Sequence, residues 1–347
     1  MDEAPSGGQV PVLSGSFPVR RYSVVGTIPS PFWDHIQEGL TRVSFSDPLS
    51  PQWSGTRAGF VTVDNLLVTD FYDRKWMSEP YVFASLRIDT KSAPAPLVKA
   101  ELDRRCKAWR IDKGAAHIPR EVKREMKEQV TADILATTSP RTKSIDFVWN
   151  VVDNWVTLGN LSDSVADQFV RLFQQAFNVT LTAWNPFGEE VPADMPGDFY
   201  LWLWWATQND ALDNVEGAAI DGKIVLTGRG SETSCTGDEV EKRPEPRSAV
   251  LDGKRPSVVK IKVTDRNLDY AFTLTGPDLH LSSLKLPEGE TSSRVDREAA
   301  ILDRLGCYEN LHGFVAHWAS TFQKFYNTKA YHEWVQSELT PWLQPKD

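Results

Sequence analysis

The chain contains 347 residues, and its 41% hydrophobic and 24% charged residues are ordinary values for a folded globular protein. No segment approaches the roughly 20 apolar residues that cross a bilayer, and the acidic N-terminal stretch lacks the apolar core of a secretory signal. A formal net charge of −9 argues against a protein that is basic throughout, but it leaves room for one basic surface. Three scattered cysteines favour a reducing cytoplasm over a disulfide framework.

The N-terminal part of the chain predicts a short lead-in followed by strands and one helix. Residues 1–16 are rich in Gly, Ser and Pro and are expected to be disordered. Phe17–Val25 has strand character, and apolar residues at four-residue spacing predict a helix over Pro31–Val43. Two further strands are predicted over Phe60–Tyr72 and Tyr81–Ile88.

The segment 97–136 combines high charge with helical periodicity. Two helices are predicted, separated by a turn at Lys113–Ala116, and the stretch Leu97–Val130 holds ten Lys/Arg against six Asp/Glu. On the second helix, basic residues at i, i+3, i+4 and i+7 share one face: Arg120, Lys123, Arg124 and Lys127. Such a face is usually a solvated helix surface, but gathered Lys and Arg are also what phosphate binding requires. The segment is therefore the strongest candidate for a functional surface.

The second half of the chain predicts further strands and a helical end. Ile145–Val156 is strand-like, and a helix is predicted over 163–177. The aromatic cluster Leu201–Trp205 is expected to pack in a core or a subunit interface rather than to stack on bases, because no Lys or Arg is interleaved with it. Adjacent strands are predicted over Val258–Val263 and Leu268–Leu274, with two lysines on one face of the first, Lys260 and Lys262.

The order of these elements indicates the fold class. Strands in runs followed by helices, without regular alternation, favour an α+β fold with mostly antiparallel sheets and a protruding charged helical segment. After the lead-in we expect an N-terminal α+β region that includes the charged helices, a β-rich region with a surface insertion, and a helical region: 17–185, 186–290 with the insertion 228–247, and 291–347.

Motifs that would indicate catalysis or a bound metal do not occur in the sequence. It has no nucleophile elbow, zinc-protease motif or phosphate-binding loop. Asp146 and Asp153 are the best candidates for a metal-dependent nuclease, but their odd spacing predicts opposite strand faces and solvated strand-end charges. His312 and His317 are five residues apart and do not share a helical face. We therefore expect no cofactor, no metal and no catalytic residues.

Several stretches occur in the order that is found in a known protein family. They are Gly59–Val61, Pro94–Lys99, Ser139–Arg141, Leu251–Lys254 and Asp296–Glu298. Over residues 17–326, the chain resembles the RdgC family of recombination-associated DNA-binding proteins.

This resemblance implies a multi-subdomain horseshoe that pairs as a homodimer and closes into a ring around double-stranded DNA. It also implies sequence-independent binding that restrains a RecA-type recombinase, in a cytoplasmic, nucleoid-associated protein without membrane contact. The DNA-contacting side chains that it suggests are Arg120, Lys123, Arg124, Lys127, Lys260 and Lys262. The dimer contact falls at Pro140, Arg141 and Thr142, where this chain lacks the aromatic residue that usually follows the Pro-Arg pair.

A second hypothesis stays open beside this one. The protein could be an acidic interaction protein that binds a recombination or defence enzyme directly rather than DNA. The net charge of −9 favours this alternative, whereas the gathered basic helix disfavours it.

Overall fold

A computed structural model describes residues 18–188, 191–287 and 297–344, so the predicted lead-in lies outside the described residues. The chain divides into two compact units, each built from separate segments. The hairpin unit comprises Gly26–Val148 and Asp167–Thr180, and the C-terminal unit comprises Met1–Val25, Trp149–Ala166 and Leu181–Asp347. Antiparallel sheets and helices make up both units, which confirms the predicted α+β class.

The hairpin unit contains strands in the order β2-β4-β5, and the short β3 also pairs with β4. Their bounds are β2 (Gly55–Val61), β3 (Met77–Ser78), β4 (Tyr81–Lys91) and β5 (Arg141–Asn150), the last crossing the unit boundary after Val148. The predicted strand over Tyr81–Ile88 is confirmed and extends further. The predicted strand over Phe60–Tyr72 is wrong, because the ladder ends at Val61. There the side chain and carbonyl of Asn65 accept the backbone N–H groups of Leu67 and Val68 and fold the chain into a loop.

Two amphipathic helices cover this sheet, α1 (Phe32–Arg42) and α4 (Asp163–Phe177). Both were predicted within one or two residues. Phe147 of β5 lies between Phe60 of β2 and Phe169 of α4, with ring centroids 4.9 and 5.0 Å away. These rings are fully buried and form the centre of the hydrophobic core of the unit.

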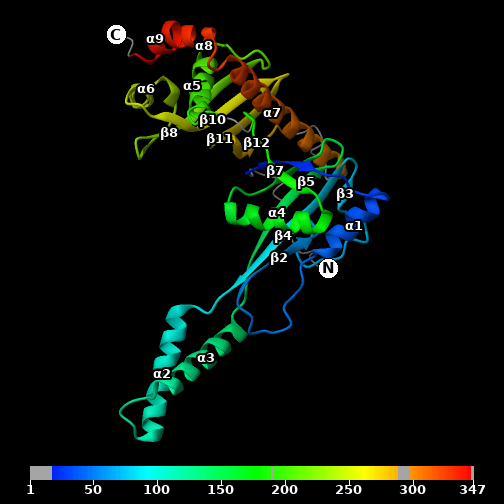
Figure 1. The fold of residues 1–347 in the computed structure, drawn as a ribbon, viewed down its shortest axis with the longest axis vertical. Helices are drawn as coiled ribbons and strands as arrows, with labels where there is room; N and C mark the ends of the chain where they lie inside the picture. Colours follow the sequence, from blue (N-terminus) through cyan, green and yellow to red (C-terminus); the bar gives the residue numbers. More distant parts are fainter. Residues whose placement is uncertain (1–17, 189–190, 288–296, 345–347) are drawn as a thin grey trace, which may run out of the picture. The chain divides into compact units, whose positions relative to one another are not determined.

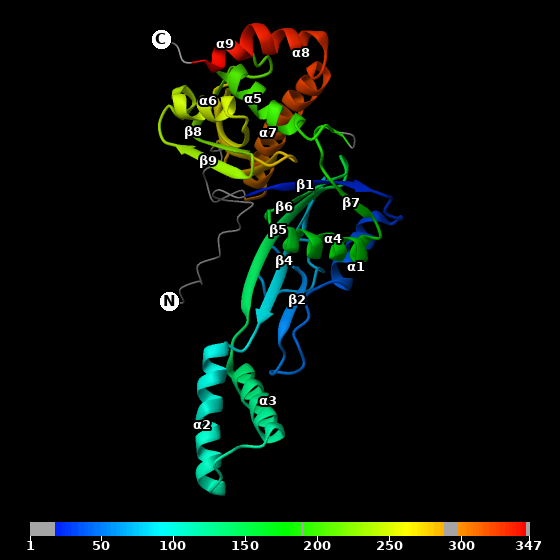
Figure 2. The same cartoon turned by 60° about the vertical axis from the view of Figure 1, so that its left-hand side comes forward.

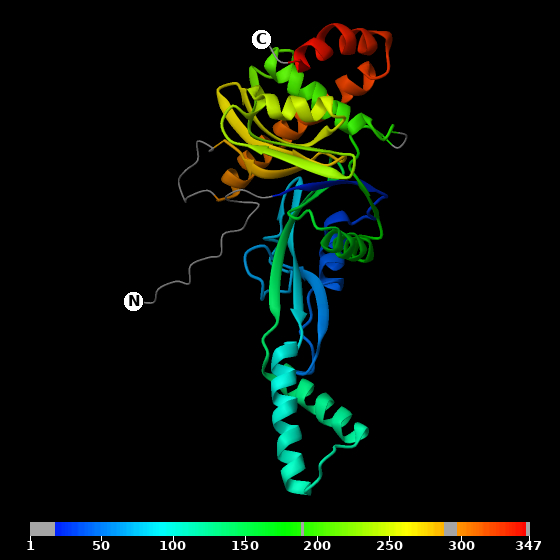
Figure 3. The same ribbon diagram turned by 90° about the vertical axis from the view of Figure 1, so that its left-hand side faces the viewer.

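A helical hairpin leaves the same unit between β4 and β5. It consists of α2 (Ala95–Lys113) and α3 (Arg120–Thr137), and it extends away from the ends of the two strands (Figure 1, Figure 3). The prediction of two helices with a turn around Lys113–Ala116 is confirmed.

The C-terminal unit contains a five-stranded antiparallel sheet. Its order is β12 (His280–Lys285), β11 (Leu268–Thr275), β10 (Arg255–Asp265), β8 (Gly217–Gly228) and β9 (Ser231–Thr236). The predicted pair β10–β11 is confirmed, and its two turn residues, Arg266 and Asn267, have φ of 50° and 62°, the left-handed conformation of tight hairpins. The segment 228–247 is not only a surface loop, since β9 within it pairs along β8.

Three further strands of this unit lie in the order β6-β1-β7: β6 (Trp155–Leu158), β1 (Arg20–Val25) and β7 (Thr180–Ala183), whose first residue belongs to the hairpin unit. The prediction of one strand over Ile145–Val156 is wrong, because residues 151–154 form a turn. The side chain of Asn150 accepts the N–H groups of Val152 and Asp153 and ends the strand there.

The helices of the C-terminal unit bury the aromatic cluster. Helix α5 (Met195–Gln208) packs on β8 and β10, and its Trp202 and Trp204 are buried. Phe322 of α7 (Arg297–Phe325) lies 5.5 Å from Trp202 between ring centroids. The cluster therefore belongs to a core, one of the two settings predicted. The other elements are α6 (Pro244–Leu251), α8 (Lys329–Trp334) and α9 (Thr340–Leu343) (Figure 2). Two short segments are η1 (Val240–Lys242) and the π-helical η2 (Val335–Leu339).

Candidate nucleic-acid interface

The hairpin is set up by local signals at the turn between its helices. Gly114 follows α2 with φ of 60°, and its N–H group points back to the carbonyls of Arg110 and Ile111, which closes the helix. Pro119 comes directly before α3, where its missing N–H costs no helical hydrogen bond. A side chain at position 114 would be strained, so glycine fits this turn.

Few apolar side chains hold the two helices together. The buried residues are Cys106 on α2 and Val130 and Leu135 on α3. Val122 and Met126 of α3 are only half-buried. The hairpin therefore depends on a small core and on polar contacts.

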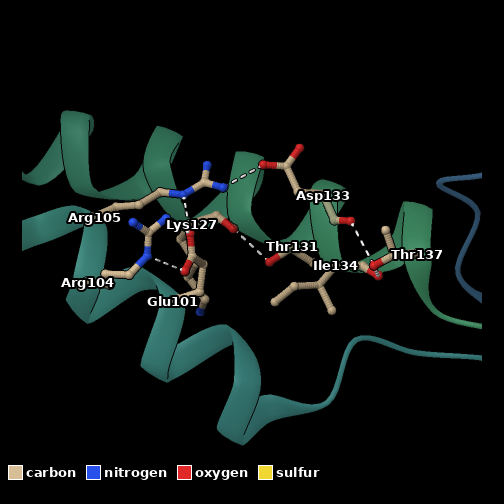
Figure 4. Close-up of polar contacts among 8 residues, drawn as sticks. All are labelled: Glu101, Arg104, Arg105, Lys127, Thr131, Asp133, Ile134 and Thr137. Carbon is tan, nitrogen blue, oxygen red and sulfur yellow. Dashed lines mark hydrogen bonds and ion pairs between the residues drawn. The ribbon is translucent and has the colours of Figure 1, made fainter.

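An ion-pair network joins residues 101–105 of α2 to Asp133 of α3 (Figure 4). Glu101 accepts hydrogen bonds from Arg104 at 2.7 Å and from the Nε of Arg105 at 2.8 Å. The Nη2 of Arg105 then reaches Asp133 of α3 at 2.7 Å. Hydrogen bonds from Arg104 and Arg105 lower the pKa of Glu101 to about 2, so the network is charged at neutral pH.

The four predicted cations of α3 are all exposed, but they differ in their partners. Arg124 lies 3.8 Å from Glu121 and 3.9 Å from Glu128, which partly neutralise it. Within the described ranges, Arg120, Lys123 and Lys127 form no ion pair.

Lys123 and Lys127 line a hollow of about 810 Å³ at the base of the hairpin. Lys99 of α2 and Lys91 of β4 also line it. Neither lysine was predicted as part of the basic face, because both lie on other elements than α3. The short turn between α2 and α3 could have predicted the position of Lys99, because it brings the two helices side by side.

The second predicted basic pair belongs to the C-terminal unit. Lys260 and Lys262 of β10 both contact Asp221 Oδ2, at 3.3 and 3.2 Å, so they do lie on one strand face. Hydrogen bonds from the two ammonium groups lower the pKa of Asp221, and the bond from Lys262 has the larger effect. Asp221 offsets part of their positive charge, and they are in a different unit from the α3 cations.

The predicted dimer-contact residues lie where α3 leads into β5. Pro140 precedes the strand, and Arg141 and Thr142 are its first two residues. All three are exposed, so a partner could reach them.

Of the two carboxylates that were considered for a nuclease, only Asp146 has other surroundings than predicted. Asp146 is not a solvated strand-end charge, since it is buried on β5 and accepts a 2.6 Å hydrogen bond from Ser85. Asp153 is exposed and accepts a hydrogen bond from Asn150. Among the described residues, no three His, Cys, Asp or Glu side chains are grouped to hold a metal ion.

Comparison with known families identifies the part of the chain that holds the hairpin. Residues 57–195 match the model of a family described as "Putative exonuclease, RdgC". This match supports membership of the RdgC family for this part of the chain. At family level, this match supports a recombination-associated role in DNA binding. No curated protein matches the chain.

The RdgC match covers α3 and residues 140–142, whereas Lys260 and Lys262 lie outside it. None of the helices in the described ranges is long and apolar enough to cross a membrane.

Proposed function

We propose that this RdgC-family protein binds double-stranded DNA without sequence preference, as a ring-like homodimer that modulates RecA-type homologous recombination. The observation that carries the proposal is the group of exposed α3 cations without an ion pair in the described part of the chain: Arg120, Lys123 and Lys127. We also propose that the protein acts in the cytoplasm, associated with the nucleoid, and that it catalyses no reaction.

Phosphate binding explains why unpaired cations matter. A lysine that already pairs with a carboxylate must give up that partner before it binds a phosphate, whereas an unpaired lysine only releases water. Each phosphate that a protein neutralises releases counterions from DNA, so such binding weakens as salt increases. Contacts of this kind position a protein on the duplex without reading bases.

The remaining predicted residues have supporting roles in this proposal. Lys260 and Lys262 would add phosphate contacts from the C-terminal unit, although Asp221 offsets part of their charge. Pro140, Arg141 and Thr142 would contact the second subunit. A net charge of −9 is compatible with this function, because a local field and not the total charge attracts the phosphate backbone.

The test reverses the charge of two α3 lysines, Lys123→Glu together with Lys127→Glu. We expect at least a tenfold loss of affinity for duplexes of any sequence and a reduction of the salt slope by about 2, one for each lost phosphate contact. The measurement is a fluorescence-anisotropy titration at several salt concentrations.

The matched control is Lys324→Glu with Lys329→Glu, which changes the net charge equally at two exposed positions of the C-terminal unit. We expect this control to bind like the wild type. Equal affinity and equal salt slope for the α3 variant and the wild type would refute the assignment of the site.

The acidic composition favours one alternative, direct binding of a recombination or defence enzyme without DNA. Absence of DNA binding at low salt, together with direct binding to a RecA-type recombinase, would favour this alternative.

A further inference from the structure

The hollow at the base of the hairpin combines two chemistries that DNA binding alone does not require. It is lined by the lysines Lys91, Lys99, Lys123 and Lys127 and by apolar side chains from both helices, Val98, Leu102 and Leu135. No Asp or Glu contributes to the lining. A ligand that fills it must therefore carry both negative charge and apolar groups.

The lysines around the hollow differ from three arginines of the hairpin that form ion pairs. Arg104, Arg105 and Arg124 each pair with a carboxylate of the hairpin. In the described ranges, Lys99 and the two α3 lysines have no such pair. The lysines at the hollow thus carry positive charge that no carboxylate of the described residues offsets, whereas these arginines are paired.

Lys91 is the least expected of these residues, because it is only 5% exposed. Its ammonium group donates a hydrogen bond to the carbonyl of Pro51 at 2.7 Å and lies 5.8 Å from the ring of Trp53. Among the described residues no carboxylate pairs with it. A buried ammonium without a counter-ion is costly, so an anion in the hollow would stabilise it.

An extended peptide matches the shape of the surroundings. Strand β2 is at the edge of the sheet, and Val43 and Phe45 bond to its outer side at Phe60. Its first residues Gly55–Arg57 are exposed, and Gly55 lines the hollow. The free side of an edge strand can pair with the backbone of an added segment, while side chains of that segment enter a neighbouring pocket.

A phosphate backbone fits this hollow less well than a peptide. Phosphates satisfy the lysines, but they would leave the apolar wall in contact with water. Burying apolar surface stabilises a complex by about 25 cal/mol per Å². A segment in which acidic residues flank one or two large apolar side chains would contact both the lysines and the apolar residues of the hollow.

We infer that the hollow formed by the ends of β2 and β4 and by the facing sides of α2 and α3 binds an extended acidic segment of a partner protein, with an apolar side chain inserted between the helices. The lysines bind the carboxylates, and Val98, Leu102 and Leu135 contact the apolar side chain.

The test uses a fluorescein-labelled peptide of four aspartates followed by a leucine and a phenylalanine. We expect it to bind the full chain at least tenfold more tightly than a peptide in which two serines replace the apolar residues, and more tightly than one in which lysines replace the aspartates. Two variants probe the two walls. Lys99→Glu reverses one charge, and Ala95→Trp blocks the hollow from an exposed position without changing charge. Each is expected to lower peptide affinity at least tenfold.

The control Ala108→Trp places the same bulk on an exposed position of α2 that does not line the hollow, and it should bind the peptide like the wild type. Ala95→Trp should leave duplex binding within twofold, which separates this inference from the proposed function. Equal peptide affinity for the wild type, Lys99→Glu and Ala95→Trp would contradict the inference. So would weaker duplex binding by Ala95→Trp with unchanged peptide binding, since the hollow would then belong to the DNA contact. The inference would also be overturned if the wild type did not bind the peptide and Ala95→Trp converted a dimer into a monomer. The hollow would then bind a second copy of the chain.

Discussion

At the scale of single residues, His312 shows how a titratable group can be buried inside the C-terminal unit. Its ring lies 4.4 Å from the ring of Trp184 between centroids, and its Nε2 is buried without a hydrogen-bond partner among the described residues. Burial, with a smaller effect from the nearby Arg21 cation, lowers the pKa of His312 to about 3. The neutral ring is therefore the form that the folded state holds.

This arrangement predicts a pH-dependent stability. As the pH falls below about 6.5, His312 of the unfolded chain binds a proton while the folded chain does not, so the free energy of unfolding decreases. Between pH 7.5 and pH 5 we expect His312 to account for a loss of about 2 kcal/mol. Urea unfolding at the two pH values should show this loss in the wild type and in the control His317→Gln, whose histidine is exposed, but not in His312→Gln. An equal loss in all three proteins would rule out His312 as the cause.

The residue scale also shows what sequence patterns can find. The α3 cations follow one helical period, so Arg120, Lys123, Arg124 and Lys127 could be predicted as one exposed face. Lys91 could not, because strand β4 is buried on both faces and the partners of its charged residues are known only from the three-dimensional structure. Arg87, for example, donates two hydrogen bonds to the buried carboxylate of Asp89.

At the scale of elements, the hairpin was predictable and several strand ends were not. Long charged helices with a glycine turn are specified locally, and the structure has them within a few residues of the prediction. The ends of β2 and β5 are instead set by side chains that bond to the backbone, Asn65 and Asn150, and hydrophobic periodicity does not detect such bonds.

The small core of the hairpin predicts that it opens more readily than the sheet of its own unit. Only Cys106, Val130 and Leu135 are buried among the described side chains of α2 and α3, whereas ten of the eleven residues of β4 are buried. Amide hydrogen exchange followed by mass spectrometry should therefore be faster over residues 95–137 than over residues 81–91. Cys106→Ser should raise exchange of the hairpin about fivefold, equivalent to about 1 kcal/mol of opening free energy, and leave β4 unchanged. Equal protection of the hairpin and β4 in the wild type would contradict this account.

At the scale of the whole molecule, the acidic composition is not what is expected of a DNA-binding protein. The chain has 47 Asp and Glu against 38 Lys and Arg, which would argue against DNA binding if charge were evenly spread. The hairpin instead concentrates cations in one short segment. Each of the two units is assembled from segments that are distant in the sequence, and local patterns cannot show such an assembly.

The proposed ring makes a prediction that phosphate contacts alone do not. A closed homodimer on a circular duplex can leave only by opening, whereas on a linear duplex it can slide off an end. We expect the protein to dissociate at least tenfold more slowly from a relaxed circle than from a linear duplex of the same length and sequence, after dilution into moderate salt. Blocking both ends of the linear duplex with bound streptavidin should slow dissociation to the rate seen on the circle. The oligomeric state, measured by sedimentation at the same salt, should be a dimer. Equal dissociation rates from the circle and the open linear duplex would show that the dimer does not encircle DNA. The α3 cations would then bind phosphates from an open surface, as the missing aromatic residue after Pro140-Arg141 would allow.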